Sequence, residues 1–184
     1  MWACDFTVIH SLFFKPLYAF VIVAHESRKV VHTAVTTNPT DEWTAQQVRE
    51  ATPWGNRPRF LIHDNDSKFG NQFKNILKNS GIKAIKTPLA APRANAICER
   101  FIGSLKREGT DNFLIFHAHQ LHRIIAAYAD YFNNLRPHQG IDQHIPMRFD
   151  EPAPPANYQL KGKVVATAVL NGLYHSYSYG HQLQ

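Results

Sequence analysis

The chain has 184 residues, enough for one hydrophobic core of ordinary size and a short appendage. Hydrophobic residues make up 44% of it and aromatic residues 12%, which excludes a disordered basic arm. The formal net charge of +6, from 20 Lys and Arg against 14 Asp and Glu, is compatible with a polyanionic partner such as nucleic acid. Cys4 and Cys98 are too few for a disulfide framework, so we expect small buried hydrophobes in a reducing compartment.

The first part of the chain predicts three β-strands. They cover residues 2–14, 17–24 and 29–36. These segments are rich in β-branched and aromatic residues, and short breaks at residues 14–16 and 25–28 separate them. Because connections this short join antiparallel neighbours, we expect a three-stranded meander.

The middle of the chain alternates helices and strands. Helices are predicted from about residue 40 to Pro53 and over 71–80, and strands over 59–63 and 82–86. Two longer helices follow over 94–108 and 118–135. Strand–helix–strand units pair in parallel through right-handed crossovers. The sequence therefore predicts an α/β protein with a five-stranded mixed sheet, three antiparallel strands and then two parallel ones, flanked by helices.

The end of the chain is predicted to be an appendage. Residues 137–155 are rich in proline and are typical of a linker. Two β-like runs over 163–170 and 173–179 flank Asn171-Gly172, which is a strong hairpin signal. We expect residues 1–146 to form the core domain and residues 147–184 to form a Pro-rich linker and a small C-terminal β-hairpin tail.

Three carboxylates stand out by their positions. Asp5 interrupts an apolar β-like run, Asp64 ends another, and Glu99 lies on a predicted helix. A carboxylate inside such a run is costly to desolvate without a cation or strong donors. The predicted order of elements lets the first and fourth strands lie side by side, which would make Asp5 and Asp64 neighbours. Three carboxylates that converge would form a site for a hard metal ion.

The helix that carries Glu99 has two contrasting faces. Its apolar face consists of Ala94, Ile97, Cys98, Phe101, Ile102 and Leu105. A second stripe contains Asn95, Glu99, Gly103 and Lys106, with Arg107 beside it. Glycine inside a helix costs about 1 kcal/mol relative to alanine, and here it would let a bulky ligand approach next to Glu99. On the helix alone, Glu99 is either such a ligand-binding acid or an ordinary solvated one.

Three blocks of sequence extend this pattern. They are FLIHDNDSKFG (60–70), TPLAAPRANAICERFIGSLKRE (87–108) and YFNNLRPHQG (131–140). With the upstream acid and the 34 residues between Asp64 and Glu99, they resemble the DDE integrase-core transposases of bacterial insertion sequences. Those proteins are relatives of retroviral integrases on the ribonuclease-H-like fold. The resemblance covers residues 1–146 and implies an integrase catalytic core.

The resemblance implies both chemistry and roles. Asp5, Asp64 and Glu99 would be the catalytic acids and would hold two Mg²⁺ ions, for which Mn²⁺ can substitute. Water as nucleophile gives nicking at the end of the element, and the freed 3′-hydroxyl then gives strand transfer into target DNA. We therefore expect an enzyme of DNA integration and recombination that needs no covalent protein intermediate.

Residues around Asp64 compete with it for a role. Asp66 stands where many relatives have glycine, but we prefer Asp64 as the metal ligand because it directly ends the apolar strand. A calcium loop is excluded, since Phe69 and Asn75 replace the glycine and glutamate that such a loop needs. His63 either tunes the site, contacts DNA or covers the sheet.

Several residues are expected to contact DNA, mostly through its phosphates. They are Arg93, Asn95, Lys106, Arg107, Arg136 and His138. For Arg136 and His138 a structural role at the end of the long helix is a second hypothesis.

The resemblance also implies partners. These are element ends and target DNA, and further copies of the chain. Relatives usually carry an upstream helix-turn-helix region, whereas only four residues precede Asp5, so we expect end recognition to come from elsewhere, for example a separately encoded protein. The alternative is a truncated, non-catalytic remnant that retains DNA binding or oligomerisation. No signal peptide or membrane span is predicted, and the expected location is the cytoplasm.

Overall fold

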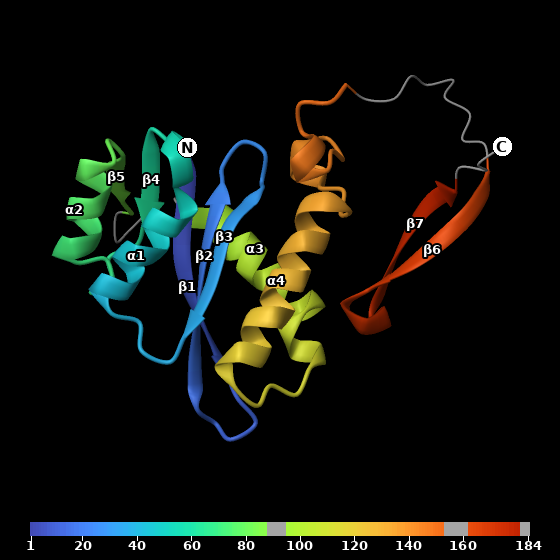
Figure 1. The fold of residues 1–184 in the computed structure, drawn as a ribbon, viewed down its shortest axis with the longest axis horizontal. Coiled ribbons are helices and arrows are strands. Elements are labelled where there is room, and N and C mark those ends of the chain that lie inside the picture. The colour runs from blue at the N-terminus through green and yellow to red at the C-terminus, as the bar shows by residue number, and fades with distance from the viewer. Residues whose placement is uncertain (88–94, 153–161, 181–184) are drawn as a thin grey trace.

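The computed structural model describes residues 1–87, 95–152 and 162–180 (Figure 1). One sheet contains β1 (Trp2–His10), β2 (Pro16–Ala24), β3 (Val30–Thr36), β4 (Phe60–His63) and β5 (Lys83–Lys86). The strand order is β3-β2-β1-β4-β5. The pairs β1/β2 and β2/β3 are antiparallel, and the pairs β1/β4 and β4/β5 are parallel. The predicted five-stranded mixed sheet is therefore confirmed.

Helices cover both faces of this sheet (Figure 1). They are α1 (Asp41–Ala51), α2 (Asn71–Asn79), α3 (Ala96–Glu108) and α4 (Ala118–Asn134). On one face, Cys4, Phe20 and Leu61 pack with α1 and α2 in one hydrophobic cluster. On the other, Ala3 and Ile62 pack with α3 and α4 in a second cluster. Because side chains alternate along a strand, odd-numbered residues of β1 face α3 and α4.

The first strand is shorter than predicted. The sequence indicated a strand over residues 2–14, but β1 ends at His10 and a turn begins at Ser11. The Ser11 N–H donates to the Lys15 carbonyl at 3.0 Å, and Phe14 takes the left-handed conformation with φ 57°. Phe14 is 86% exposed, so this apolar segment forms an exposed turn. Apolar residues alone did not distinguish it from a strand.

Helix α2 receives its N-terminal cap from another element. Its own N-cap residue is Gly70, which has no side chain to accept hydrogen bonds. Instead, the Asp41 carboxylate accepts from the N–H groups of Gln72 at 2.8 Å and Phe73 at 2.9 Å. A Cβ on Gly70 would lie 2.5 Å from Asp41 Oδ2, so only glycine permits this approach. The cap joins the start of α1 to the start of α2.

The predicted C-terminal hairpin is also present. It contains β6 (Lys163–Val169) and β7 (Tyr174–Gly180), joined by a helical turn over Leu170–Gly172. Tyr174 stacks on Tyr131 of α4, with ring centroids 5.4 Å apart. This contact holds the turn end of the hairpin against α4. Among the described helices, none is long and apolar enough to cross a membrane.

Candidate active site

Two of the three predicted acids lie side by side on the sheet, Asp5 within β1 and Asp64 directly after the parallel neighbour β4. The β1/β4 pairing sets Trp2 beside Leu61 and Ala3 beside Ile62. The same offset brings Asp5 level with Asp64, one residue beyond the end of β4. Neighbouring strands are about 4.8 Å apart, and alternation directs both side chains to the face covered by α3 and α4. The two carboxylates therefore lie close together.

Asp5 occupies a costly position for a negative charge. Its Oδ1 accepts from the Phe6 N–H at 2.7 Å, and its Oδ2 accepts from Asn95 Nδ2 at 3.1 Å. Burial raises the pKa of Asp5 to about 6 against the opposing effect of the Phe6 N–H, and the negative charges of Asp64, Glu99 and Asp66 contribute to the increase. The three other acids thus lie near enough to Asp5 to disfavour its negative charge.

Asn95 holds Asp5 from the start of α3. It is 5% exposed, and its Nδ2 also donates to the Cys4 carbonyl at 3.3 Å. Its Oδ1 is buried and has no hydrogen-bond partner in the described part of the chain. The sequence predicted a DNA contact for Asn95, but its amide points inward to the acid. Only the fold reveals this role, because Cys4 and Asp5 lie about ninety residues earlier.

Asp64 and Asp66 differ in their partners. Asp66 forms an ion pair with Lys68, and its Oδ1 accepts from the Lys68 N–H at 3.0 Å. Burial opposes ionisation of Asp66, but the hydrogen bonds from Lys68 outweigh it and lower the pKa of Asp66. Asp64 Oδ1 accepts only from the Asp66 N–H, at 3.2 Å, among the contacts of the described residues. Asp64 is thus the more available ligand of the two.

His63 packs into the core. It is 3% exposed and lies against Phe69 and Phe73, with ring centroids 5.1 and 5.2 Å away. Its Nδ1 donates to the Asp64 carbonyl at 2.7 Å, and burial lowers the pKa of His63. This geometry favours the hypothesis that His63 covers the sheet and braces the backbone of Asp64.

Glu99 lies in the first turn of α3 and is exposed. A Cβ on Gly103, one turn further along, would meet no atom within 4 Å, so the space beside Glu99 is open. Within residues 1–87, 95–152 and 162–180, however, no three His, Cys, Asp or Glu side chains form a ready metal-binding group. Asp5 and Asp64 are placed by the sheet, and the charge of Glu99 on α3 contributes to the raised pKa of Asp5.

The predicted DNA contacts fall into separate places. Lys106 and Arg107 lie in the last turn of α3, with Arg107 exposed. Arg93 lies outside the described residues. Arg136 and His138 follow α4, and His138 is 9% exposed. His138 uses both ring nitrogens within the protein, which supports the structural hypothesis for it.

The strand order and the helices on both faces of the sheet are those of a ribonuclease-H-like fold, with Asp5 and Asp64 side by side on it. Residues 80–146 match the family model of the Integrase core domain. A protein of *Xanthomonas euvesicatoria*, the insertion element IS476 uncharacterized 39.2 kDa protein, is 24% identical over 174 residues, which are 94% of this chain and 49% of that protein. The chain thus spans about half the length of this curated relative.

Solved integrases share the fold. The catalytic core of BIV integrase superposes with a TM-score of 0.60 at 20% identity, over 80% of this chain and 90% of that one. The HTLV-2 integrase core in complex with magnesium gives 0.61 at 17% identity, over 80% and 93%. A chain in the structure of the simian T-cell lymphotropic virus intasome in complex with PP2A regulatory subunit B56 gamma gives 0.66 at 16% identity, over 97% of this chain and 66% of that one. The predicted resemblance to integrase-core transposases is confirmed, in sequence over residues 80–146 and in fold over most of the chain.

Proposed function

We propose that this chain is the catalytic core of a DDE-type transposase that nicks DNA at the ends of a mobile element and transfers the strands into a target. The observation that carries the proposal is the position of Asp5 beside Asp64. Asp5 lies on β1, and Asp64 directly follows the parallel neighbouring strand β4. Glu99 supports it, because its charge contributes to the raised pKa of Asp5. Proteins with this family match act on DNA, and the basic chain suits a polyanion.

The donor set suits Mg²⁺. Asp5, Asp64 and Glu99 would hold two ions, and three carboxylates suffice because Mg²⁺ completes its shell with water and phosphate oxygens. When bound, such ions activate an oxygen nucleophile and stabilise the leaving oxygen. The fit is supported by the mutual repulsion of the acids and by the buried, unpartnered Asn95 Oδ1 beside them.

The chain's own residues prepare this site. Asn95 Nδ2 fixes one oxygen of Asp5 and the Phe6 N–H fixes the other, so the carboxylate has one orientation. Lys68 neutralises Asp66 and leaves Asp64 as the free acid of that loop. Lys106 and Arg107 would bind DNA phosphates along α3, and we retain Arg93, Arg136 and His138 as candidate contacts or supports.

The proposal extends to organisation and partners. We propose residues 1–146 as the catalytic unit and residues 147–184 as linker and hairpin tail. Element ends and target DNA would be its substrates, in the cytoplasm, and further copies of the chain would join the DNA complex.

The test is nicking and strand transfer on duplex DNA with Mg²⁺ or Mn²⁺. We expect activity in the wild type and its loss in Glu99→Gln, because the substitution removes one metal-binding charge. Glu50→Gln on α1 is the matched control, since Glu50 is an exposed glutamate on the opposite face of the sheet. Asp64→Asn should abolish activity and Asp66→Asn should retain it.

Two outcomes would contradict parts of this proposal. Equal activity in Glu99→Gln and the wild type would overturn the assignment of the three acids. If the wild type and all variants bind DNA but none of them nicks it, the result would favour the non-catalytic remnant.

A further inference from the structure

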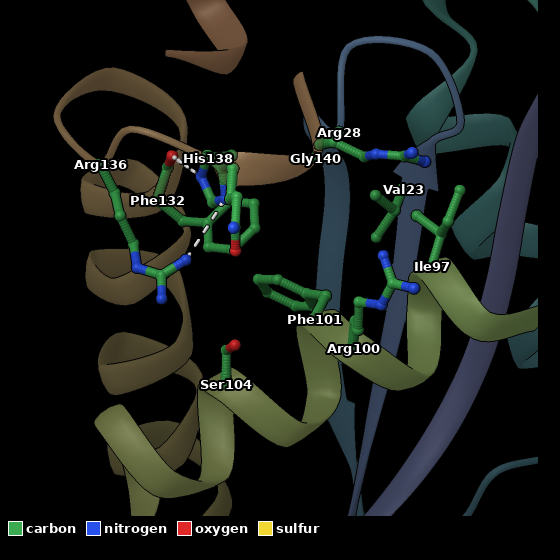
Figure 2. Close-up of a pocket in the computed structure, with 11 residues that line it drawn as sticks. Val23, Arg28, Ile97, Arg100, Phe101, Ser104, Phe132, Arg136, His138 and Gly140 are labelled. Carbon is green, nitrogen blue, oxygen red and sulfur yellow. Dashed lines mark hydrogen bonds between the residues drawn. The ribbon is translucent and has the colours of Figure 1, made fainter. Parts of the chain in front are cut away.

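A cationic cavity lies on the α3–α4 side of the sheet. It has a volume of about 480 Å³ and opens between the β2–β3 turn, α3 and the segment that follows α4 (Figure 2). Three of its lining residues are arginines, namely Arg28, Arg100 and Arg136. None of the described lining residues is an aspartate or a glutamate. The cavity therefore concentrates positive charge.

Arg28 reaches this cavity from a strained turn. Its backbone is in the left-handed region with φ 61°, which is unfavourable for a residue other than glycine. Its Nη1 donates to the His25 carbonyl at 2.6 Å, which fixes the side chain. Burial and the positive charge of Arg100 lower the pKa of Arg28. The fold thus holds two guanidinium groups together against their repulsion.

Arg136 is held in place from two sides. Its Nη2 donates to Glu108 Oε1 at 2.7 Å, and its Nη1 donates to His138 Nδ1 at 3.3 Å. His138 Nε2 in turn lies 3.2 Å from the Phe132 carbonyl. Since a guanidinium and a carbonyl fix the roles of both ring nitrogens, His138 is the neutral Nε2–H tautomer. The guanidinium group of Arg136 is therefore oriented before any ligand binds.

Arg100 supplies the uncompensated charge. It is exposed, and in the described part of the chain it forms no ion pair or hydrogen bond. Ser104, one turn further along α3, presents a hydroxyl to the same cavity (Figure 2). Glu108 balances one arginine, so two guanidinium charges remain without a carboxylate partner at the cavity.

The cavity and the acidic site lie on different faces of α3. Successive helical residues are about 100° apart, so Arg100 and Ser104 share one stripe. Glu99 and Gly103 share another stripe. It faces away from Ile97, which lies at the centre of the stripe of α3 that lines the cavity. A helix with its side chains is about 10 Å across. A group bound in the cavity is therefore not the group that reacts at the acids.

We propose that this cavity binds a phosphodiester group of a DNA segment other than the one under attack. The proposal rests on DNA as the substrate proposed above. Arginine guanidinium groups match phosphate oxygens with paired hydrogen bonds, and three of them line the cavity together with a hydroxyl donor. Such a contact positions the DNA without selecting its sequence.

The test measures binding of a labelled duplex without divalent metal, at a series of salt concentrations. Each phosphate contact contributes about 0.9 to the slope of log affinity against log salt, so Arg100→Gln should bind more weakly with a slope reduced by about that amount. Arg49→Gln on α1 is the matched control and should keep the wild-type slope, because Arg49 lies on the other face of the sheet. Both arginines are exposed, so both variants should fold.

Several results would overturn the proposal. One is an equal slope in Arg100→Gln, Arg49→Gln and the wild type. Another is binding of inorganic phosphate in the cavity while the salt dependence of DNA binding is unchanged in Arg100→Gln, which would indicate that the ligand is a free anion. A third is altered self-association of Arg100→Gln with unchanged DNA binding, which would indicate an acidic protein partner. Because the binding assay contains no divalent metal, a reduced slope would still support DNA binding at the cavity even if the wild type failed to nick DNA.

Discussion

The substitution Asp5→Asn should stabilise the metal-free protein while removing its activity. Asp5 is mostly buried, and its pKa is raised from 3.8 to about 6. An acid whose pKa rises on folding favours the folded state only while it is protonated. The free energy of unfolding should therefore fall as the pH rises from about 4 to about 6, and the whole penalty should be present at neutral pH.

The size of the effect follows from the pKa and the hydrogen bonds. A difference from 3.8 to about 6 corresponds to about 3 kcal/mol. Asparagine keeps the shape but has one acceptor oxygen, whereas Asp5 accepts through both of its oxygens. The lost hydrogen bond costs about 1 kcal/mol. Asp5→Asn should thus be more stable than the wild type by about 2 kcal/mol at neutral pH.

Urea unfolding of both proteins across this pH range, with and without Mg²⁺, checks the prediction. Without metal, the wild type should lose stability between pH 4 and about 6, and Asp5→Asn should lose less. With Mg²⁺, only the wild type should gain stability, because metal binds its folded state. If Asp5→Asn is less stable than the wild type at neutral pH without metal, the account of Asp5 as a destabilising buried charge is wrong.

Three further substitutions test supporting contacts by urea unfolding. Asp41→Ala should cost about 1 kcal/mol, because it removes the cap of α2; Gly70→Ala should cost at least as much, and a neutral result for both would refute the cap. Glu108→Ala should destabilise by about 3 kcal/mol, because it leaves the partly buried Arg136 unpaired, whereas Glu50→Ala should change little. Gly103→Ala should stabilise by about 1 kcal/mol, since its Cβ enters open space; weaker DNA binding by this variant would show that the space is used.

The sequence predicted most of the fold because its signals are local. Short connections between β-branched runs indicate antiparallel strands, and strand–helix–strand units indicate parallel ones, so Asp5 and Asp64 could be placed as neighbours. The contacts that the sequence did not predict join distant segments. Asn95 reaches Asp5, and Asp41 caps a helix 31 residues later. No local pattern distinguishes such a residue from an ordinary polar one.

The grouping of the three cavity arginines was missed for a related reason. Arg28 belongs to a turn, whereas Arg100 and Arg136 lie in blocks that resemble the family, where Arg136 was predicted to contact DNA and Arg100 was passed over beside Glu99. Their shared surface depends on how α3 and the segment after α4 pack over the sheet. The positive φ at Arg28 is a backbone signal that only the structure reveals.

The choice between Asp64 and Asp66 illustrates what a metal-binding acid requires. Both acids lie in one loop, but Lys68 compensates Asp66 and lowers its pKa, so a metal would have to displace an ammonium group. Among the described residues, the donors to Asp5 are neutral, the Asn95 amide and a backbone N–H, and they orient the carboxylate and leave its charge in place. A bound cation would relieve that charge and its repulsion by Asp64 and Glu99 together. At the proposed site, the electrostatic cost of the uncompensated carboxylate would thus favour the binding of a metal ion.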